Sequence, residues 1–324
     1  MKIPTSATGS VALTTMLAPI SWGTTYWVVT ELMPVDRPLL VAAMRVVPAG
    51  LLLLSIGAFT SGWRPHGREW RDLALLSLAN FGLFFPLLVA ATYRVPGGVI
   101  ASFAGLQPLL VLAGTWLIAG TAPRSRDIGI GILAALGVVL VVGLPGGALD
   151  PLGLLLALAA NISFASGVVL TRRTPAPPDR IAHTGWQLVL SGIVIVPLAL
   201  LAEGVPATVT APNLLGLVYL GIVATGIASV LWFRGIPRLP VAAPPLLGLS
   251  SAVTGVVVGW LALGQALTSA QTAGLLITLG AIAYGATVRP ARPPSEARVP
   301  APNPGQPQPS EPRTSPAREP GAVS

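Results

Sequence analysis

Long apolar runs follow one another along most of this 324-residue chain. Each spans about 20 residues, the length that an α-helix needs to cross the hydrocarbon core of a bilayer. Charged residues make up only 9% of the chain, whereas soluble domains contain roughly 25%. The sequence therefore predicts an all-α polytopic membrane protein with the lipid bilayer as its surroundings. Ten transmembrane helices are expected, at 11–30, 38–59, 72–92, 96–119, 127–144, 151–171, 181–201, 213–233, 240–262 and 269–288.

One of these apolar stretches occurs twice. Residues 94–120 return as residues 238–264, and the constant offset of 144 pairs Arg94 with Arg238, Pro96 with Pro240, and Trp116 with Trp260. A weaker offset of 142 pairs Ser21 with Ser163, Arg45 with Gln187, and Gly50 with Gly192. Internal repeats of this kind divide a chain into structural units. Here they predict two halves that meet near residue 149.

Each half is expected to hold five helices. Because five is odd, the second half must enter the membrane upside down, which gives two inverted five-helix repeats. Inverted repeats are typical of secondary transporters, with the substrate site near the bilayer midplane between the halves. The expected organisation is a short cytoplasmic N-terminus (1–10), a first repeat (11–149), a second repeat (150–288) and a tail (289–324). Eleven of the 36 tail residues are proline, so we expect a disordered, Pro/Arg-rich cytoplasmic tail.

The arginine and lysine residues predict the orientation, because cytoplasmic loops carry the excess of positive charge. With the N-terminus inside, 16 of the 19 basic residues fall in inner segments, and only Arg37 and Arg94 fall outside. The chain is therefore expected in the cell (plasma) membrane with both termini cytoplasmic. The net charge of +8 belongs to these loops, and no nucleic-acid partner is expected.

Several short motifs carry a resemblance to a known family. They are Trp22-Gly23-Thr24-Thr25-Tyr26, Leu106-Gln107-Pro108, the run from Ser163 to Arg173, and the stretch from Gly264 to Gln271. In this order the chain resembles the EamA family of the drug/metabolite transporter superfamily over residues 11–288. The resemblance implies two five-helix repeats and export of small metabolites, including amino acids and their analogues. Gln107 departs from the glutamate of many members, and Thr121 and Gln265 stand where the family's Gly-Glu turn has its acid.

The chain lacks the groups that intramembrane catalysis needs. All eleven carboxylates lie in loops, at helix ends or in the tail, and there are no cysteines. No G-x-S-x-G motif is present, and a nucleophile would need a base beside it. We therefore expect no enzyme activity, no cofactor and no metal site. Transport driven by protonation of a membrane-embedded carboxylate is not expected either.

The substrate site is expected at mid-membrane between the halves. Gln107 and Ser251 are related by the offset of 144, and each lies about eleven residues, or ~16 Å, into its helix. The other candidates are Trp22, Tyr26 and Phe164 as apolar walls, with Asn80, Asn161 and Ser163 at similar depth. Two alternatives remain open: the polar side chains bond one another across helices, and Trp22 only packs between helices.

Arg45 is the charged residue that lies well inside an expected span. One hypothesis is that it meets a substrate carboxylate or phosphate. The alternative is that it extends outward to the membrane interface or bonds backbone carbonyls freed near Pro48. Prolines also lie inside other expected spans, and Pro108 and the Pro244-Pro245 pair flank the duplicated helix, where they are candidates for hinges.

These observations predict a secondary transporter that moves a small organic metabolite by alternating access. The resemblance favours an exporter of an amino acid, an analogue or a drug-like solute. The alternatives are a passive channel or pore, which needs a continuous polar stripe, and a membrane scaffold protein that transports nothing. The sequence leaves the choice between monomer and homodimer open.

Overall fold

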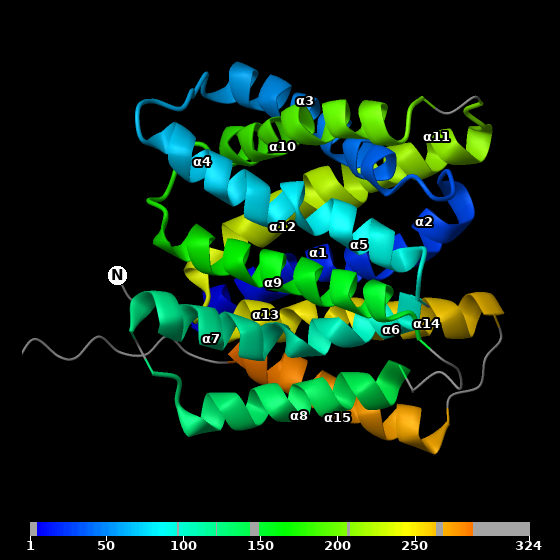
Figure 1. The fold of residues 1–324 in the computed structure, drawn as a ribbon. Helices are drawn as coiled ribbons and strands as arrows, with labels where there is room; N and C mark the ends of the chain where they lie inside the picture. The colour runs from blue at the N-terminus through cyan, green and yellow to red at the C-terminus, as the bar shows by residue number, and fades with distance from the viewer. Residues whose placement is uncertain are drawn as a thin grey trace, which may run out of the picture. The chain divides into compact units, whose positions relative to one another are not determined.

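In the computed structural model, every regular element formed by the described residues is a helix (Figure 1). The described residues are 5–95, 97–120, 122–142, 149–205, 208–263 and 268–287. The expected tail at 289–324 and the turn that contains Gln265 lie outside these ranges. The prediction of an all-α protein is confirmed for the part of the chain that is described.

Helices occupy all five segments expected in the first half, and three of the segments are broken. The elements are α1 (Thr5–Gly23), α2 (Thr25–Leu32), α3 (Pro38–Thr60), α4 (Glu69–Ser77), the π-helical η1 (Leu78–Gly82), α5 (Phe84–Thr92), α6 (Gly97–Phe103), the 3₁₀-helical η2 (Ala104–Leu106), α7 (Gln107–Ala119) and α8 (Ser125–Val142).

The second half is built in the same way. Its elements are α9 (Pro151–Arg173), α10 (Arg180–Ala202), α11 (Ala211–Val218), the π-helical η3 (Tyr219–Ile227), α12 (Ala228–Gly235), the 3₁₀-helical η4 (Ile236–Arg238), α13 (Ala243–Gly248), α14 (Ser250–Leu263) and α15 (Ser269–Thr287). The largest buried apolar cluster lies where α1, α3, α5, α9, α10 and α12 converge, around Val46, Leu188 and Trp232.

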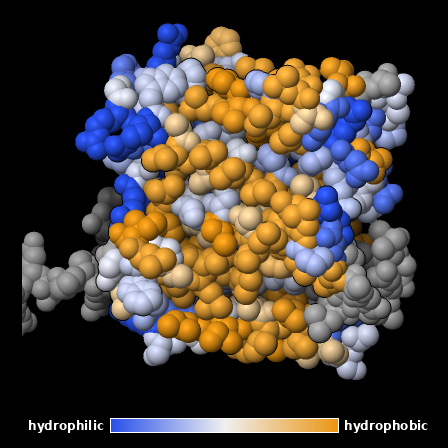
Figure 2. Space-filling view, viewed as in Figure 1, coloured by the Kyte–Doolittle hydropathy of each residue, from blue (hydrophilic) through white to orange (hydrophobic). Residues whose placement is uncertain are grey.

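The surface of this bundle is apolar. Five helical stretches in the described residues are long and apolar enough to cross a membrane: Pro38–Thr60, Glu69–Thr92, Pro151–Arg173, Arg180–Ala202 and Ala211–Arg238. Figure 2 shows one face covered by apolar side chains between two polar margins. Phe59 is 92% exposed and Leu201 is 85% exposed. Contiguous apolar surface of this extent is unusual in soluble proteins, and the protein is a multi-pass membrane protein.

Helices α3 and α10 pack against each other along their length. Glycines allow the close approach: a Cβ atom on Gly57 would lie 2.6 Å from the Cβ of Ala182, and one on Gly185 would lie 2.9 Å from the backbone nitrogen of Leu54. Small residues serve the same purpose at helix interfaces in membranes generally. The two helices are antiparallel, because the ends of each meet the opposite ends of the other.

A carboxylate closes the α3–α10 pair at each end. Glu203, after the C-terminus of α10, accepts hydrogen bonds from the backbone N–H groups of Leu39 and Leu40 at 2.8 Å each. These N–H groups have no partner within the first turn of α3. At the other end Asp179 caps α10, accepting from the N–H groups of Ile181 at 2.7 Å and Ala182 at 3.1 Å.

Asp179 also joins the two helices, since the hydroxyl of Ser61 donates to its carboxylate over 2.6 Å. Burial raises the pKa of Asp179, but this hydrogen bond and those from the two backbone N–H groups outweigh it and hold the pKa below its usual value. The carboxylate is therefore ionised at neutral pH and bonded to both helices.

Helices α8 and α15 form a second tight pair. A Cβ atom on Gly274 of α15 would lie 2.5 Å from the backbone nitrogen of Val141 and 2.6 Å from the carbonyl oxygen of Gly137. Backbone atoms cannot move aside as the end of a side chain can. By contrast, a Cβ atom on Gly280 of the same helix would meet nothing within 4 Å.

We predict that Gly274→Ala lowers the thermal unfolding temperature of the detergent-solubilised protein, at a cost of ~1–3 kcal/mol, because the added methyl group overpacks the contact. Gly280→Ala is the matched control. It should leave the unfolding temperature unchanged or raise it, since alanine favours a helix over glycine by about 0.5–1 kcal/mol. Equal effects of the two substitutions would contradict this account of the α8–α15 contact.

Candidate functional site

The helices that carry Gln107 and Ser251 are both broken beside these residues. The 3₁₀ segment η2 ends at Leu106, and α7 begins at Gln107. In the second half α13 ends at Gly248, and α14 begins at Ser250. Pro108 is thus at the second position of α7, and Pro244 and Pro245 follow the first residue of α13. Proline is well suited to the first turn of a helix, where its missing N–H group leaves no bond unmade.

The π-helical segments η1 and η3 also occupy corresponding helices, and each accepts a side chain from another helix. The Ser163 hydroxyl donates to the carbonyl oxygen of Ala79 over 2.8 Å. The indole N–H of Trp22 donates to the carbonyl oxygen of Ala224 over 2.9 Å. The change in helix winding leaves backbone carbonyls available for such bonds. In both cases the donor comes from the other half of the chain.

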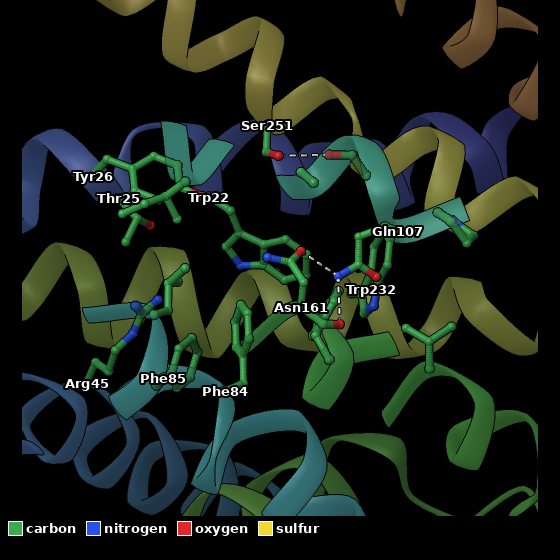
Figure 3. A pocket seen from close by; sticks show the side chains of 17 residues that line it. Trp22, Thr25, Tyr26, Arg45, Phe84, Phe85, Gln107, Asn161, Trp232 and Ser251 are labelled. Atoms are coloured by element: carbon green, nitrogen blue, oxygen red, sulfur yellow. Dashed lines mark hydrogen bonds between the residues drawn. The ribbon is translucent and has the colours of Figure 1, made fainter. Parts of the chain in front are cut away.

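A cavity lies between the two halves (Figure 3). Side chains from both halves line it, and seven of the nine predicted site residues are among them. These seven are Trp22, Tyr26, Arg45, Gln107, Asn161, Phe164 and Ser251. The duplication and the depth argument therefore identify residues that the fold brings together.

Gln107 and Asn161 form a polar cluster in the cavity wall. The side-chain amide of Gln107 donates to the side-chain oxygen of Asn161 over 2.8 Å and to its backbone oxygen over 3.1 Å. The Asn161 amide donates in turn to the carbonyl oxygen of Ala157 over 2.9 Å. The expectation that polar side chains bond one another across helices therefore holds for this pair, which nevertheless lines the cavity.

The middle of the cavity is aromatic. The Trp22 ring lies edge-on to Phe164 with 5.6 Å between the centroids, and edge-on to Trp232 at 5.2 Å. Phe84 stacks beside Phe164 at 4.9 Å. Aromatic rings at these separations contribute beyond the area they bury. Trp22 therefore both packs between helices and forms a wall of the cavity.

Arg45 is fully buried beside the cavity, with only 1% of its surface exposed. Its Nε donates to the hydroxyl of Thr225 over 3.0 Å, and its guanidinium carbon lies 3.8 Å above the centre of the Phe85 ring. The alternative in which Arg45 extends to the membrane interface is contradicted by this burial. The alternative of bonding to carbonyls near Pro48 is replaced by the bond to Thr225.

Asn80 and Ser163 do not line this cavity, contrary to the expectation that residues at this depth would gather there. Asn80 donates to the side-chain oxygen of Gln187 over 3.0 Å. Gln187 is the residue that the offset of 142 pairs with Arg45. Both the bond between Asn80 and Gln187 and the bond between Thr225 and Arg45 therefore join a π segment to one of these paired positions. Asn80 and Ser163 thus bond to groups outside the cavity lining, Gln187 and the carbonyl oxygen of Ala79.

The cavity also contains residues that the sequence did not single out. Phe84, Phe85 and Trp232 supply much of the aromatic wall, and Thr25 lies beside Tyr26. Phenylalanine in an apolar span carries no signal that separates a cavity wall from ordinary packing. Trp232 could have been noticed as a tryptophan close to the end of its predicted helix.

A helical membrane bundle with a central cavity lined from two duplicated halves is the architecture of a solute carrier. The model of the EamA-like transporter family matches residues 9–143 and again 151–284. The chain belongs to this family, within the drug/metabolite transporter superfamily. The resemblance found in the motifs is thereby confirmed, and the family and its named relatives are transporters.

Relatives of this chain come from several organisms. Protein PecM of Dickeya dadantii is 38% identical over 267 residues, which is 82% of this chain and 88% of that protein. The uncharacterized inner membrane transporter YedA of Escherichia coli K12 is 26% identical over 277 residues, covering 81% and 88% of the two chains. A solved crystal structure matches with a TM-score of 0.69 at 20% identity, over 86% of this chain and 96% of that one. This last similarity shows that the fold is shared.

We predict that Gln107→Ala and Asn161→Ala destabilise the protein non-additively. Interhelical hydrogen bonds in membrane proteins couple by ~0.6 kcal/mol on average and up to ~1.7 kcal/mol. A double-mutant cycle on the free energy of unfolding should give a coupling in that range for this pair. Additive effects would mean that the two side chains do not stabilise each other, and Thr115→Ala combined with Asn161→Ala serves as an uncoupled reference.

Proposed function

We propose that this protein is a secondary transporter that exports a small organic metabolite across the plasma membrane by alternating access. The solute occupies the cavity between the halves, against the seven predicted residues that line it. The observation that carries the proposal is the pair of helix breaks at Gln107 and Ser251, equivalent positions that both face the cavity. An amino acid, an analogue or a drug-like solute is the class of cargo that the family relationship favours.

The arrangement of helices supports two inverted five-helix repeats at 11–149 and 150–288. Helices α3 and α10 hold equivalent places in the two halves and run antiparallel, as inversion requires. Contacts come in matched sets: α5 packs on α9 as α12 packs on α1. The π segments η1 and η3 also recur in matching helices. Ten membrane crossings follow from this arrangement.

A second pocket supports access from the opposite side of the membrane. It is lined by Gln187, His183, Arg180 and Arg172 among others. Gln187 is the counterpart of Arg45, and the two lie toward opposite ends of the antiparallel α3–α10 pair. In an inverted-repeat carrier, rocking of one repeat against the other exposes one fixed site alternately to the two sides.

Both termini and the segments at 64–71 and 172–180 are cytoplasmic in this proposal. We predict that Ala176→Cys is protected from an impermeant thiol reagent in intact cells and reacts after permeabilisation. Val35→Cys is the matched control, because residue 35 is 74% exposed and lies in a connection expected outside. The native chain has no cysteine, so the introduced residue is the one thiol that the reagent can label. Labelling of residue 176 from outside would overturn the orientation.

Solute movement is expected to follow the solute gradient. The lining residues of the cavity in the described chain include no aspartate or glutamate, and arginine keeps its proton at any working pH. Uphill accumulation of a non-titrating solute in proteoliposomes, driven by a pH gradient alone, would contradict this part of the proposal.

Substitution of two adjacent serines tests whether the solute binds in the cavity. The Ser251 hydroxyl donates to the carbonyl oxygen of Gly248 over 2.9 Å, and the Ser250 hydroxyl donates to that of Leu247 over 2.8 Å. Of these two serines, only Ser251 lines the cavity. We predict that Ser251→Ala raises the half-saturation constant for export several-fold, as one hydrogen bond of about 0.5–1.5 kcal/mol allows. Ser250→Ala should leave it unchanged at equal expression.

The same measurement separates the rival functions. Gln107→Ala and Trp22→Ala should also raise the half-saturation constant if the cavity binds the solute. A passive pore would show flux that does not saturate with solute concentration. A scaffold protein would show no flux in proteoliposomes and no solute-dependent thermal stabilisation. Unchanged affinity in Gln107→Ala, Ser251→Ala and Trp22→Ala together would place the site elsewhere.

A further inference from the structure

Three residues that line the cavity each carry a buried polar atom without a hydrogen-bond partner. These atoms are Nη1 of Arg45, Nε1 of Trp232 and the hydroxyl oxygen of Thr25. The three side chains are 1%, 1% and 4% exposed respectively, so neither water nor lipid headgroups reach them from the surface. Nη1 of Arg45 and Nε1 of Trp232 can only donate, whereas the Thr25 hydroxyl can donate or accept. Unpaired buried donors are costly, so the cavity is short of acceptors.

The charge of the cavity points the same way. Arg45 carries a positive charge, and the described residues that line the cavity include no carboxylate to balance it. The contact with the Phe85 ring and the bond to Thr225 compensate the guanidinium only in part, because its Nη1 remains free. A buried cation normally has an anionic partner. The described residues that line the cavity supply no such partner, so an anionic solute would complete the site.

The polar groups lie at two ends of an aromatic space. In Figure 3, Arg45, Thr25 and Tyr26 gather on one side, and Gln107 and Asn161 on the other, with Trp22 between them. A solute that fills this space would have an acidic group at one end, a flat apolar body, and room for a polar group at the other end.

The second pocket has the same charge character. Arg172 and Arg180 line it, and no aspartate or glutamate appears among its described lining residues. An anion that approached from this side would be attracted on entry, whereas a cation would be repelled.

We propose that the cargo is an organic monocarboxylate with an aromatic or similarly flat body, held through its carboxylate by Nη1 of Arg45. This inference rests on the proposed transport function and narrows its substrate class. A zwitterionic amino acid is a poorer cargo, because the cavity lining offers no carboxylate to its ammonium group. Arg45 sets the charge selectivity, while the aromatic rings accept the body of the solute.

The test uses four probes of nearly one shape: 3-phenylpropionate, 3-phenylpropanamide, phenylalanine and 2-phenylethylamine. Each is titrated into the purified full-length protein, and binding is followed by the shift in thermal unfolding temperature. We expect the carboxylate to bind about tenfold or more tightly than the amide, as a charge-assisted hydrogen bond allows. Phenylalanine should bind more weakly than the carboxylate, and the amine should show no measurable binding.

Three arginine variants show whether Arg45 causes the preference for the carboxylate over the amide. Arg45→Gln should bring the ratio of carboxylate to amide affinity close to one, and Arg45→Lys should keep part of it. Arg94→Gln is the matched control, because Arg94 is a surface residue paired with Asp150 at 2.9 Å. It should leave the ratio unchanged. The unfolding temperature and elution profile without probe report whether each variant is folded.

Several outcomes would overturn the inference: equal binding of carboxylate and amide, a preference that survives Arg45→Gln in the folded protein, or no binding of the carboxylate. Flux of the same probes in proteoliposomes tests the transport function separately. Flux of the amide or amine without any carboxylate preference would leave the transporter proposal standing and refute the substrate class. Arg45-dependent binding without flux would support the anion site and refute transport.

Discussion

The absence of water inside a bilayer governs this structure, because every backbone group released by a broken helix must find a partner within the protein. The helices break at several mid-membrane positions. Trp22 and Ser163 donate hydrogen bonds to two of these carbonyl groups, which lie in η3 and η1 respectively. Both donors come from the half of the chain that does not contain the break. The bonds that satisfy the backbone are therefore also the bonds that hold the two halves together around the cavity.

The duplicated stretch predicted two residues that line one cavity, because equivalent positions in two repeats reach similar depth. Gln107 and Ser251 line one cavity for this reason. Depth alone does not say which way a side chain faces, and Asn80 and Ser163 do not line this cavity. Their partners are on η1 and α10, and helix rotation within a bundle depends on packing that no single span encodes.

The helix breaks were only partly visible in the sequence. The η1 segment ends at Gly82, one turn before Pro86, whose missing N–H leaves the carbonyl of Gly82 without its helical partner. The η3 segment contains no proline. Instead, Trp22 and Arg45 donate hydrogen bonds to this segment, at Ala224 and Thr225. The glutamine at position 107 also has a chemical consequence. Its neutral amide can donate to both oxygens of Asn161, which an ionised glutamate could not do.

The α3–α10 pair has a mechanical consequence. It is closed by Glu203 at one end and by Asp179 at the other, and its glycines leave no slack between the backbones. Sliding by one helical turn would break both closures at once and drive side chains into backbone atoms. The pair therefore resists sliding, and in the proposed carrier the opening and closing would come from the surrounding helices. Thr225 and Asn80 bond to this pair through Arg45 and Gln187, so a shift of either π segment would be transmitted to the same two helices.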